Sequence, residues 1–332
     1  MKKIIIDTDP GVDDMMAIFL ALNSPELEVL GLTTIFGNVM TPQASQNALT
    51  LLELAGKSEI PVAEGAEQPL KQSFTKPASF VHGDDGFGNT HPAKPQGKVI
   101  AQSAADFIIE QINKYPGEVT LVALAPLTNL ALAVQKDPSI VNKVKEVVVM
   151  GGVVRSSGNV SPVSEANIMG DPHAGDVVMV AGWPLTLITL DITLQVLMTD
   201  NRMLYIQEKN PKLGKFMYDV SRFYKNFYES VYNITGFGFH DPCTVLYLLE
   251  PGLFEFINGP VRVVTEGIAK GQTIIDTHQK WFNDSPWCNK PHSKVSIKAD
   301  AEGLLDSFVK RIRSEEHTSE LQSQSNIVCR LL

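Results

Sequence analysis

The sequence predicts an α/β protein in which helices flank an open, mostly parallel sheet. Short runs rich in Val, Ile and Leu alternate along the chain with segments of helical periodicity. These runs are nearly all apolar, as in parallel strands that are covered on both faces. A content of 44% hydrophobic and 20% charged residues is enough for a packed core. We therefore expect a Rossmann-like sheet, whose ligands usually bind beyond the carboxyl ends of the strands.

The predicted elements follow one another in a regular order. Strands are expected where β-branched and other apolar residues cluster, at 3–6, 29–35, 119–124, 146–150 and 185–190. Helices are expected between them, where the apolar period is close to 3.6 residues, at 13–22, 42–55, 101–113, 127–135 and 171–181. A helical section at 200–250 is followed by short strands at 261–264 and 294–297 and by a last helix at 300–313.

Residues 1–312 are predicted to form one domain, because no linker, low-complexity tract or internal repeat divides them. Residues 313–332 differ from this part: they are polar and have neither helical nor strand periodicity. The run Arg-Ser-Glu-Glu-His-Thr-Ser-Glu-Leu-Gln-Ser-Gln-Ser resembles the translation of a common sequencing-adapter oligonucleotide. We interpret this segment as a non-native, disordered tail, the alternative being a natural solvated one.

Charge and composition narrow the range of partners. The formal net charge of -9 and the pI near 5.3 argue against a nucleic-acid backbone or an anionic membrane as the main partner. The three cysteines have no paired spacing, so neither a disulfide framework nor a zinc site is indicated. No apolar stretch has the length of a signal-peptide core or a membrane span, which predicts a cytoplasmic protein.

The first predicted strand opens into four closely spaced carboxylates, Asp7, Asp9, Asp13 and Asp14. Like charges a few ångströms apart repel, and each carboxylate loses solvation if it is partly buried. Asp13 alone has a structural explanation as a helix N-cap, and capping requires only one of the four. The cluster therefore predicts a hard divalent cation with oxygen ligands.

Three further segments carry polar side chains that a parallel sheet is expected to bring to the same edge. Asn159, Glu165 and Asn167 supply donors and acceptors suited to sugar hydroxyls, although a polar surface loop has the same composition. His240 and Asp241 open an apolar helix; the first is a candidate general acid with an ordinary pKa, and the second is a metal ligand or an N-cap. The glycine-rich residues 82–89 form either a lid or a long turn.

Together these segments resemble the nucleoside hydrolases, the inosine–uridine-preferring N-ribohydrolase family, over residues 1–312. The block Asp-Thr-Asp-Pro-Gly-Val-Asp-Asp at 7–14 matches the family's DxDPGxDD signature, which is highly specific. Met-Gly-Gly at 150–152, Glu-x-Asn at 165–167 and His-Asp at 240–241 follow in the family's order. The resemblance implies hydrolysis of a ribonucleoside to ribose and free base.

The resemblance also implies a calcium site and a general base. Asp9, Asp14 and Asp241 match the family's Ca²⁺-binding carboxylates, and Leu124 matches a residue that contributes its main-chain carbonyl. A water and two ribose hydroxyls complete the ion's shell in the family, in keeping with the six to eight oxygen ligands of calcium. Asp9 matches the general base that takes a proton from that water.

The remaining matches concern the substrate. Asp13 and Asn38 match residues near the ribose 2′-hydroxyl, and His240 matches the acid that protonates the leaving base. The other residues implied to contact the ribose or the base are Asn159, Glu165, Asn167 and His82. Tyr228 and Tyr232, one helical turn apart and shortly before His240, are our own candidates for base contacts, with packing in the core as the alternative.

Some features separate this chain from other members. The family usually has an aromatic residue between the Glu and Asn of Glu-x-Asn, whereas this chain has Ala166, which shortens one wall of the ribose pocket. Ala166 and the residues from His82 onward are most similar to plant-type and pyrimidine-cleaving members, so we expect a uridine preference with inosine as a further substrate. A homodimer or homotetramer is usual in the family.

Two alternative functions use the same residues. A ribose or nucleoside sensor would bind in the same cleft without turnover. A haloacid-dehalogenase-like phosphatase also places Asp-x-Asp after its first strand, but it has Thr or Val where this chain has Gly11, and it has no role for the Asp13–Asp14 pair. Release of uracil from uridine separates the three functions.

Overall fold

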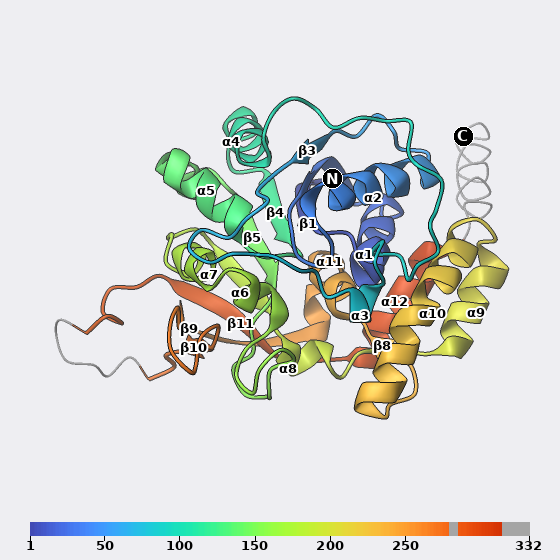
Figure 1. Ribbon diagram of the computed structural model, residues 1–332. Coiled ribbons are helices and arrows are strands. Elements are labelled where there is room, and N and C mark those ends of the chain that lie inside the picture. Colours follow the sequence, from blue (N-terminus) through green and yellow to red (C-terminus); the bar gives the residue numbers. More distant parts are fainter. Residues whose placement is uncertain (279–284, 314–332) are drawn as a thin grey trace, which may run out of the picture.

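Nine strands form one central sheet in the computed structural model, which describes residues 1–278 and 285–313 (Figure 1). Their spatial order is β10-β9-β11-β6-β5-β4-β1-β2-β3. The strands are β1 (Lys2–Thr8), β2 (Leu27–Thr34), β3 (Val62–Glu64), β4 (Val119–Ala123), β5 (Glu146–Met150), β6 (Leu185–Ile188), β9 (Phe254–Val263), β10 (Thr273–Ile275) and β11 (His292–Ala299). All pairs from β3 to β11 are parallel, and only β9 pairs antiparallel with its neighbours β11 and β10. The predicted α/β class with a mostly parallel sheet is confirmed.

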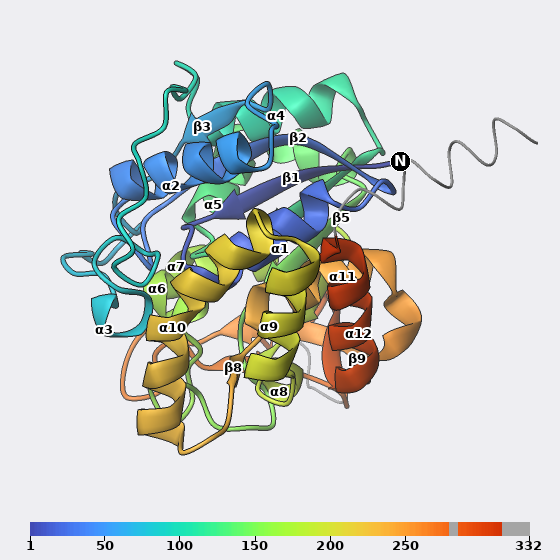
Figure 2. The ribbon, with the colours of Figure 1, turned by 90° about the vertical axis from the view of Figure 1, so that its right-hand side faces the viewer.

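Helices cover both faces of this sheet, as Figures 1 and 2 show. One face carries α4 (Ala104–Lys114), α5 (Thr128–Lys136) and α7 (Pro172–Met179). The opposite face carries α1 (Val12–Leu22), α2 (Thr41–Leu54), α9 (Asp200–Lys209), α10 (Leu213–Tyr232), α11 (His240–Leu249) and α12 (Ala301–Ile312). The smaller elements include three one-turn helices, α3 (Ser79–His82), α6 (Ala166–Gly170) and α8 (Leu190–Thr193). They also include the two-stranded pair of β7 (Leu197–Met198) and β8 (Phe237–Gly238) and the 3-10 helices Pro138–Asn142 and Pro251–Leu253.

The central strand β1 shows why its sequence is continuously apolar. Ile4 and Ile6 belong to the hydrophobic core beneath α1 and α11, whereas Ile5 belongs to the core beneath α4 and α5. All three side chains are fully buried. Successive side chains of a strand point to opposite faces, so a strand covered by helices on both sides has no solvent-facing position.

Helix α1 begins directly after β1 and brings two carboxylates to the end of the strand. Its N-cap is Gly11, whose backbone N–H donates to Asp14 Oδ2 at 3.0 Å. Asp13 and Asp14 lie in the first turn, where a helix attracts negative charge. Because nearly every residue of α1 is buried, packing on both neighbours α10 and α11 fixes the direction of this turn.

The structure differs from the sequence prediction mainly in short elements. The strand predicted at 185–190 ends at Ile188, and Leu190 already begins α8. The strand predicted at 261–264 is the end of the longer β9. The prediction of a disordered tail falls, apart from Arg313, outside the described residues. Within the described residues, no helix is both long enough and apolar enough to cross a bilayer.

Candidate active site

A cavity of about 140 Å³ lies beyond the carboxyl ends of β1, β4 and β5. Segments that are distant in sequence meet there, because parallel strands bring their carboxyl ends to one edge of the sheet. Most of the residues singled out from the sequence line this cavity, whereas Asp7, Asp9 and Asp14 do not. The lining residues are Asp13, Asn38, His82, Leu124, Asn159, Glu165, Asn167, Tyr228, Tyr232, His240 and Asp241.

Three carboxylates converge at the inner end of the cavity. One oxygen each from Asp13, Asp14 and Asp241 lie within 4.8 Å of one another, and all three residues are buried. Burial raises the pKa of each, and the charges of Asp13 and Asp14 raise the pKa of Asp241 further. Among the ion pairs of the described residues, none links this cluster to a Lys or Arg.

Asp9 lies against this cluster but is not one of the three that converge. Its Oδ2 accepts a hydrogen bond from the Asn38 backbone N–H at 2.5 Å, whereas its Oδ1 is buried and has no hydrogen-bond partner among the described residues. Burial raises the pKa of Asp9 well above its usual value, and the charges of Asp14 and Asp13 raise it further. One oxygen of this buried carboxylate is thus left for a group that the described part of the chain does not supply.

Asp14 accepts hydrogen bonds at both carboxylate oxygens, whereas Asp7 accepts two at Oδ1 and has an Oδ2 without a partner among the described residues. Asp14 Oδ1 accepts from the Thr8 hydroxyl at 2.5 Å, and Asp14 Oδ2 accepts from the Asn38 amide at 3.0 Å. Asp7 Oδ1 accepts from the Thr33 hydroxyl at 2.6 Å and from the Asn129 amide at 2.8 Å. Asp7 therefore ties β1 to β2 and α5.

The donor set fits a hard divalent cation. Buried carboxylates without a cationic side chain are costly, and an ion with oxygen ligands offsets that cost. The unpartnered Asp9 Oδ1 and the converging oxygens of Asp13, Asp14 and Asp241 provide such ligands. The convergence includes Asp13, which belongs to the acidic cluster of the sequence and which the family resemblance assigns to the ribose.

Glu165 and Asn167 line the cavity at the N-terminus of α6. Glu165 is the N-cap of α6, and its carboxylate accepts from the backbone N–H groups of Asn167, Ile168 and Gly152 at 2.8–3.0 Å. The Asn167 amide donates to the Leu124 carbonyl at 2.8 Å. Glu165 thus shapes this wall through the backbone, a function that the sequence alone did not indicate.

His240 lies at the start of α11 between two hydroxyl groups. Its Nδ1 is 2.7 Å from Thr193 Oγ1, and its Nε2 is 2.6 Å from the Tyr228 hydroxyl. The Tyr224 hydroxyl follows at 3.3 Å from that of Tyr228. Burial lowers the pKa of His240 to about 4, so the expectation of an ordinary imidazole pKa is wrong and the ring is neutral near pH 7.

His82 lies at the end of α3 and faces the acidic loop. Its Nδ1 accepts from the Val12 backbone N–H at 3.2 Å, and its ring stacks on Tyr224 with centroids 5.0 Å apart. Burial lowers its pKa to about 3. The next residues form a tight turn, because the Asp85 carboxylate accepts from the backbone N–H groups of Phe87, Asn89 and His91 at 2.7–2.9 Å. Residues 82–89 thus include a hydrogen-bonded turn, and their role as a lid stays a prediction.

The sequence missed several residues that complete the cavity. Tyr224, Phe227 and Phe80 also line it; Tyr224 is buried, whereas Phe80 is exposed and lies in edge contact with Phe227 at 5.8 Å between centroids. Tyr224 was within reach of prediction, because it shares one helix face with Tyr228 and Tyr232 at four-residue spacing. No local pattern marks Phe80, which reaches the site only through the fold.

A glycine beside Asp9 provides a test of this geometry. A Cβ added at Gly37 would lie 1.9 Å from Asp9 Oδ2. We expect Gly37→Ala to displace the Asp9 carboxylate and to lower turnover strongly, measured as kcat. Gly252→Ala is the matched control, since a Cβ there would meet nothing within 4 Å and turnover should persist. Equal kcat values for the two variants would contradict the placement of Asp9.

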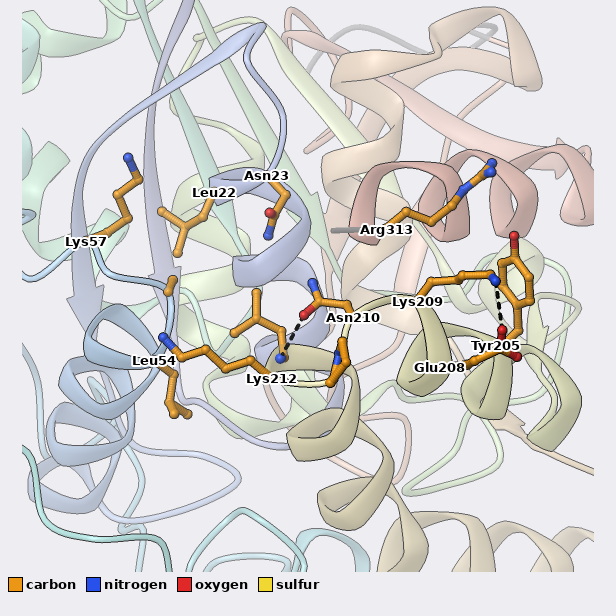
Figure 3. A pocket seen from close by; sticks show the side chains of 13 residues that line it. Leu22, Asn23, Leu54, Lys57, Tyr205, Glu208, Lys209, Asn210, Lys212 and Arg313 are labelled. Carbon is orange, nitrogen blue, oxygen red and sulfur yellow. Dashed lines mark hydrogen bonds and ion pairs between the residues drawn. The ribbon is translucent and has the colours of Figure 1, made fainter. Parts of the chain in front are cut away.

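A larger surface hollow of about 810 Å³ lies at the opposite end of α1 (Figure 3). Lys57, Lys209, Lys212 and Arg313 border it, and Glu208 is the one acidic residue among those that line it. Glu208 is paired with Lys209 at 2.7 Å. Because this hollow offers no carboxylate cluster, the smaller cavity is the candidate active site.

Comparison with known proteins defines the class. A model of the inosine-uridine preferring nucleoside hydrolase family matches residues 4–306, and the protein therefore belongs to this family. It is 44% identical to uridine nucleosidase 1 of Arabidopsis thaliana over 92% of this chain and 91% of that protein. It is 39% identical to the inosine-uridine preferring nucleoside hydrolase of Leishmania major over 83% of this chain and 88% of that protein.

Solved structures agree with this membership. The fold matches that of a plant nucleoside hydrolase with a TM-score of 0.92 and 43% identity, over 94% of this chain and 99% of the other. It also matches a purine-preferring ribonucleoside hydrolase from Gardnerella vaginalis with a TM-score of 0.87 and 36% identity, over 94% and 98%. The family predicted from the sequence is confirmed.

Proposed function

We propose that this protein hydrolyses the N-glycosidic bond of ribonucleosides, with uridine as the preferred substrate and inosine as a further one. The observation that carries the proposal is the meeting, in one cavity, of a buried carboxylate cluster with the hydrogen-bonded pair Tyr228–His240. Hydrolysis of the N-glycosidic bond requires a cation site beside the ribose and a proton donor beside the base, and this cavity has one at each end.

We assign the cation as calcium, held by Asp9, Asp14, Asp241 and the carbonyl of Leu124. When bound, it lowers the pKa of a water and orients the ribose hydroxyls. Asp13 lies beside these groups and lines the cavity, so we place it with Asn38 against the 2′-hydroxyl. The support for this division is the family resemblance together with the free Asp9 Oδ1.

The reaction follows from the positions of these side chains. Asp9 accepts a proton from the attacking water, whose oxygen bonds to C1′ of the ribose. The bond from C1′ to the base nitrogen breaks, its electron pair leaves with the base, and the buried carboxylates favour the positive charge that develops on the sugar. A proton reaches the departing base from the Tyr228–His240 pair, which burial keeps neutral before the reaction. The pair then regains a proton from solvent, and Asp9 releases to solvent the proton that it took from the water.

The sugar contacts are assigned to the other wall of the cavity. We place Asn159 and Asn167 against the 3′- and 5′-hydroxyls, with Glu165 holding Asn167 in position through its backbone N–H. Ala166 is exposed and lines the cavity where a larger side chain would extend the wall. A less enclosed ribose is the expected consequence of this substitution.

The base preference rests on relatives and on the outer cavity. Relatives at 43–45% identity over more than 90% of this chain are named uridine nucleosidases or probable uridine nucleosidases. Tyr232, which is 41% exposed, and His82 border the place we assign to the base. A panel of uridine, cytidine, inosine and adenosine tests the preference, and kcat/KM should be highest for uridine. A higher value for a purine nucleoside would overturn it.

The 2′-hydroxyl should be essential. In a site built to bind a hydroxyl, its removal leaves buried polar groups unpaired and typically costs about 10⁴-fold in kcat/KM. We therefore expect 2′-deoxyuridine to be cleaved about 10⁴-fold less efficiently than uridine, measured by uracil release. Comparable efficiency for the two substrates would exclude Asp13, Asn38 and the cation from contact with the 2′-hydroxyl.

We also propose a homodimer or homotetramer, as is usual for the family, and a cytoplasmic location. Ile268, at the turn between β9 and β10, and Val231 on α10 are largely exposed apolar side chains that an assembly could cover. Light scattering coupled to gel filtration tests the assembly, and a monomer at micromolar concentration would contradict it. Cell fractionation tests the location.

A further inference from the structure

Asp191 is a buried carboxylate that the proposed reaction does not use. It lies on α8, directly beyond β6, and is only 4% exposed. Its Oδ2 accepts from the Val154 backbone N–H at 2.9 Å, and its Oδ1 accepts from those of Arg155 and Ser156 at 2.7 Å each. None of the ion pairs among the described residues includes it. Three backbone dipoles therefore balance its charge.

The residues that Asp191 holds begin the loop that carries Asn159. This segment, residues 153–164, is called the Asn159 loop here. The Leu190 N–H donates to the Gly152 carbonyl at 3.0 Å, so the loop starts alongside α8. At its far end, the Ser164 hydroxyl donates to the Lys270 carbonyl at 2.5 Å. Between these two anchors, Asn159 is exposed and lines the cavity.

We propose that Asp191 is a positioning residue, which holds the Asn159 loop in the conformation that receives the ribose. The role of Asn159 in this proposal rests on the proposed function. The hydrogen bonds between Asp191 and residues 154–156 do not depend on that function. Both Asp191 oxygens accept backbone N–H groups of this loop, and Asp191 is buried and does not line the cavity, so its contacts are with the loop and not with the substrate. Hydrogen bonds to an ionised acceptor are stronger than neutral ones, which makes the charge the important property.

The expected effect is on binding rather than on the chemical step. If the loop occupies its binding conformation only about a tenth of the time, the apparent affinity falls about tenfold. Contacts that are equal in the ground state and the transition state change KM and leave kcat unaltered. We therefore expect Asp191→Asn, which keeps the shape and removes the charge, to raise KM for uridine about tenfold with kcat within about twofold.

Hydrogen exchange measures the anchor directly. In the wild-type protein, the amides of Val154, Arg155 and Ser156 should exchange slowly although the side chains of Arg155 and Ser156 are exposed. In Asp191→Asn these amides should exchange faster. Asp300→Asn is the control, because Asp300 also accepts from a backbone N–H, that of Gly303 at 3.0 Å, but at the start of α12. It should change neither KM nor exchange at residues 154–156.

The outcomes separate this proposal from the proposed function. Fast exchange at residues 154–156 in the wild-type protein, or a loss of kcat with unchanged KM in Asp191→Asn, would overturn the role of Asp191. If the wild-type protein releases no base from any ribonucleoside, the proposed function fails, and the exchange data with the Kd for uridine still decide the role of Asp191. The wild-type exchange also decides it if Asp191→Asn does not fold.

Discussion

Asp9→Asn is expected to lower kcat for uridine by about 10²- to 10⁴-fold, the usual contribution of a positioned general base. The amide has the shape of the carboxylate but cannot take a proton from the attacking water. The Asn38 N–H contact at Oδ2 uses an oxygen that asparagine can also present, so the fold should persist. Steady-state release of uracil measures the turnover, and circular dichroism checks the fold.

A neighbouring carboxylate provides the comparison for this variant. Asp7 is as buried as Asp9 and also has one oxygen without a partner among the described residues, but the charges of Asp13 and Asp14 raise the pKa of Asp9 and not that of Asp7. Asp7→Asn should affect mainly stability, seen as a lower Tm, because it alters the contacts to Thr33 and Asn129. Near-normal kcat in Asp9→Asn would remove Asp9 as the base.

Removal of the divalent cation should abolish turnover and lower stability together. Without it, the buried charges of Asp13, Asp14 and Asp241 repel one another and lack a counter-charge. A ligand that binds only the folded state stabilises it by about 2.7 kcal/mol at a free concentration of about 100 times its Kd. Dialysis against a chelator followed by a calcium titration, with Tm and uracil release as readouts, measures both effects.

Two controls make the calcium experiment specific. Magnesium at the same concentration should restore less activity, because Mg²⁺ is smaller and requires stricter geometry than Ca²⁺. Asp241→Asn should weaken calcium binding measured by calorimetry, since it removes the charge of one of the three converging carboxylates. Full activity in the presence of the chelator, with no calcium bound, would contradict the assignment of the cation.

The sequence predicted those helices and strands that a pattern of neighbouring residues defines. The strand Glu146–Met150 was predicted with its observed bounds because an apolar β-branched run between turns has one common structure. Short elements such as β3 and β10, of three residues each, were not predicted. Pairing with neighbouring strands stabilises them, and local sequence does not encode that pairing. Leu190 was predicted to lie in a strand because it continues the apolar run of β6, although the strand ends at Ile188 in the structure.

The site shows a similar division. The carboxylates of the acidic loop were identified from electrostatics alone, and the motif order then linked them to Asp241, which the fold indeed brings within 4.8 Å of Asp13 and Asp14. Properties of the site that depend on burial could not be predicted from the sequence. The low pKa of His240 arises from its enclosure, and the capping role of Glu165 arises from the start of α6.

Quantitative product analysis with uridine tests the central claim most directly. The calcium-loaded protein should convert uridine to equal amounts of uracil and ribose, and a chelator should stop the conversion until calcium is added again. The result that would contradict the account is uridine that binds in the presence of calcium and is recovered unchanged, which would define a nucleoside-binding protein. Release of phosphate from a generic phosphoester with magnesium, and no uracil from uridine, would instead indicate a phosphatase.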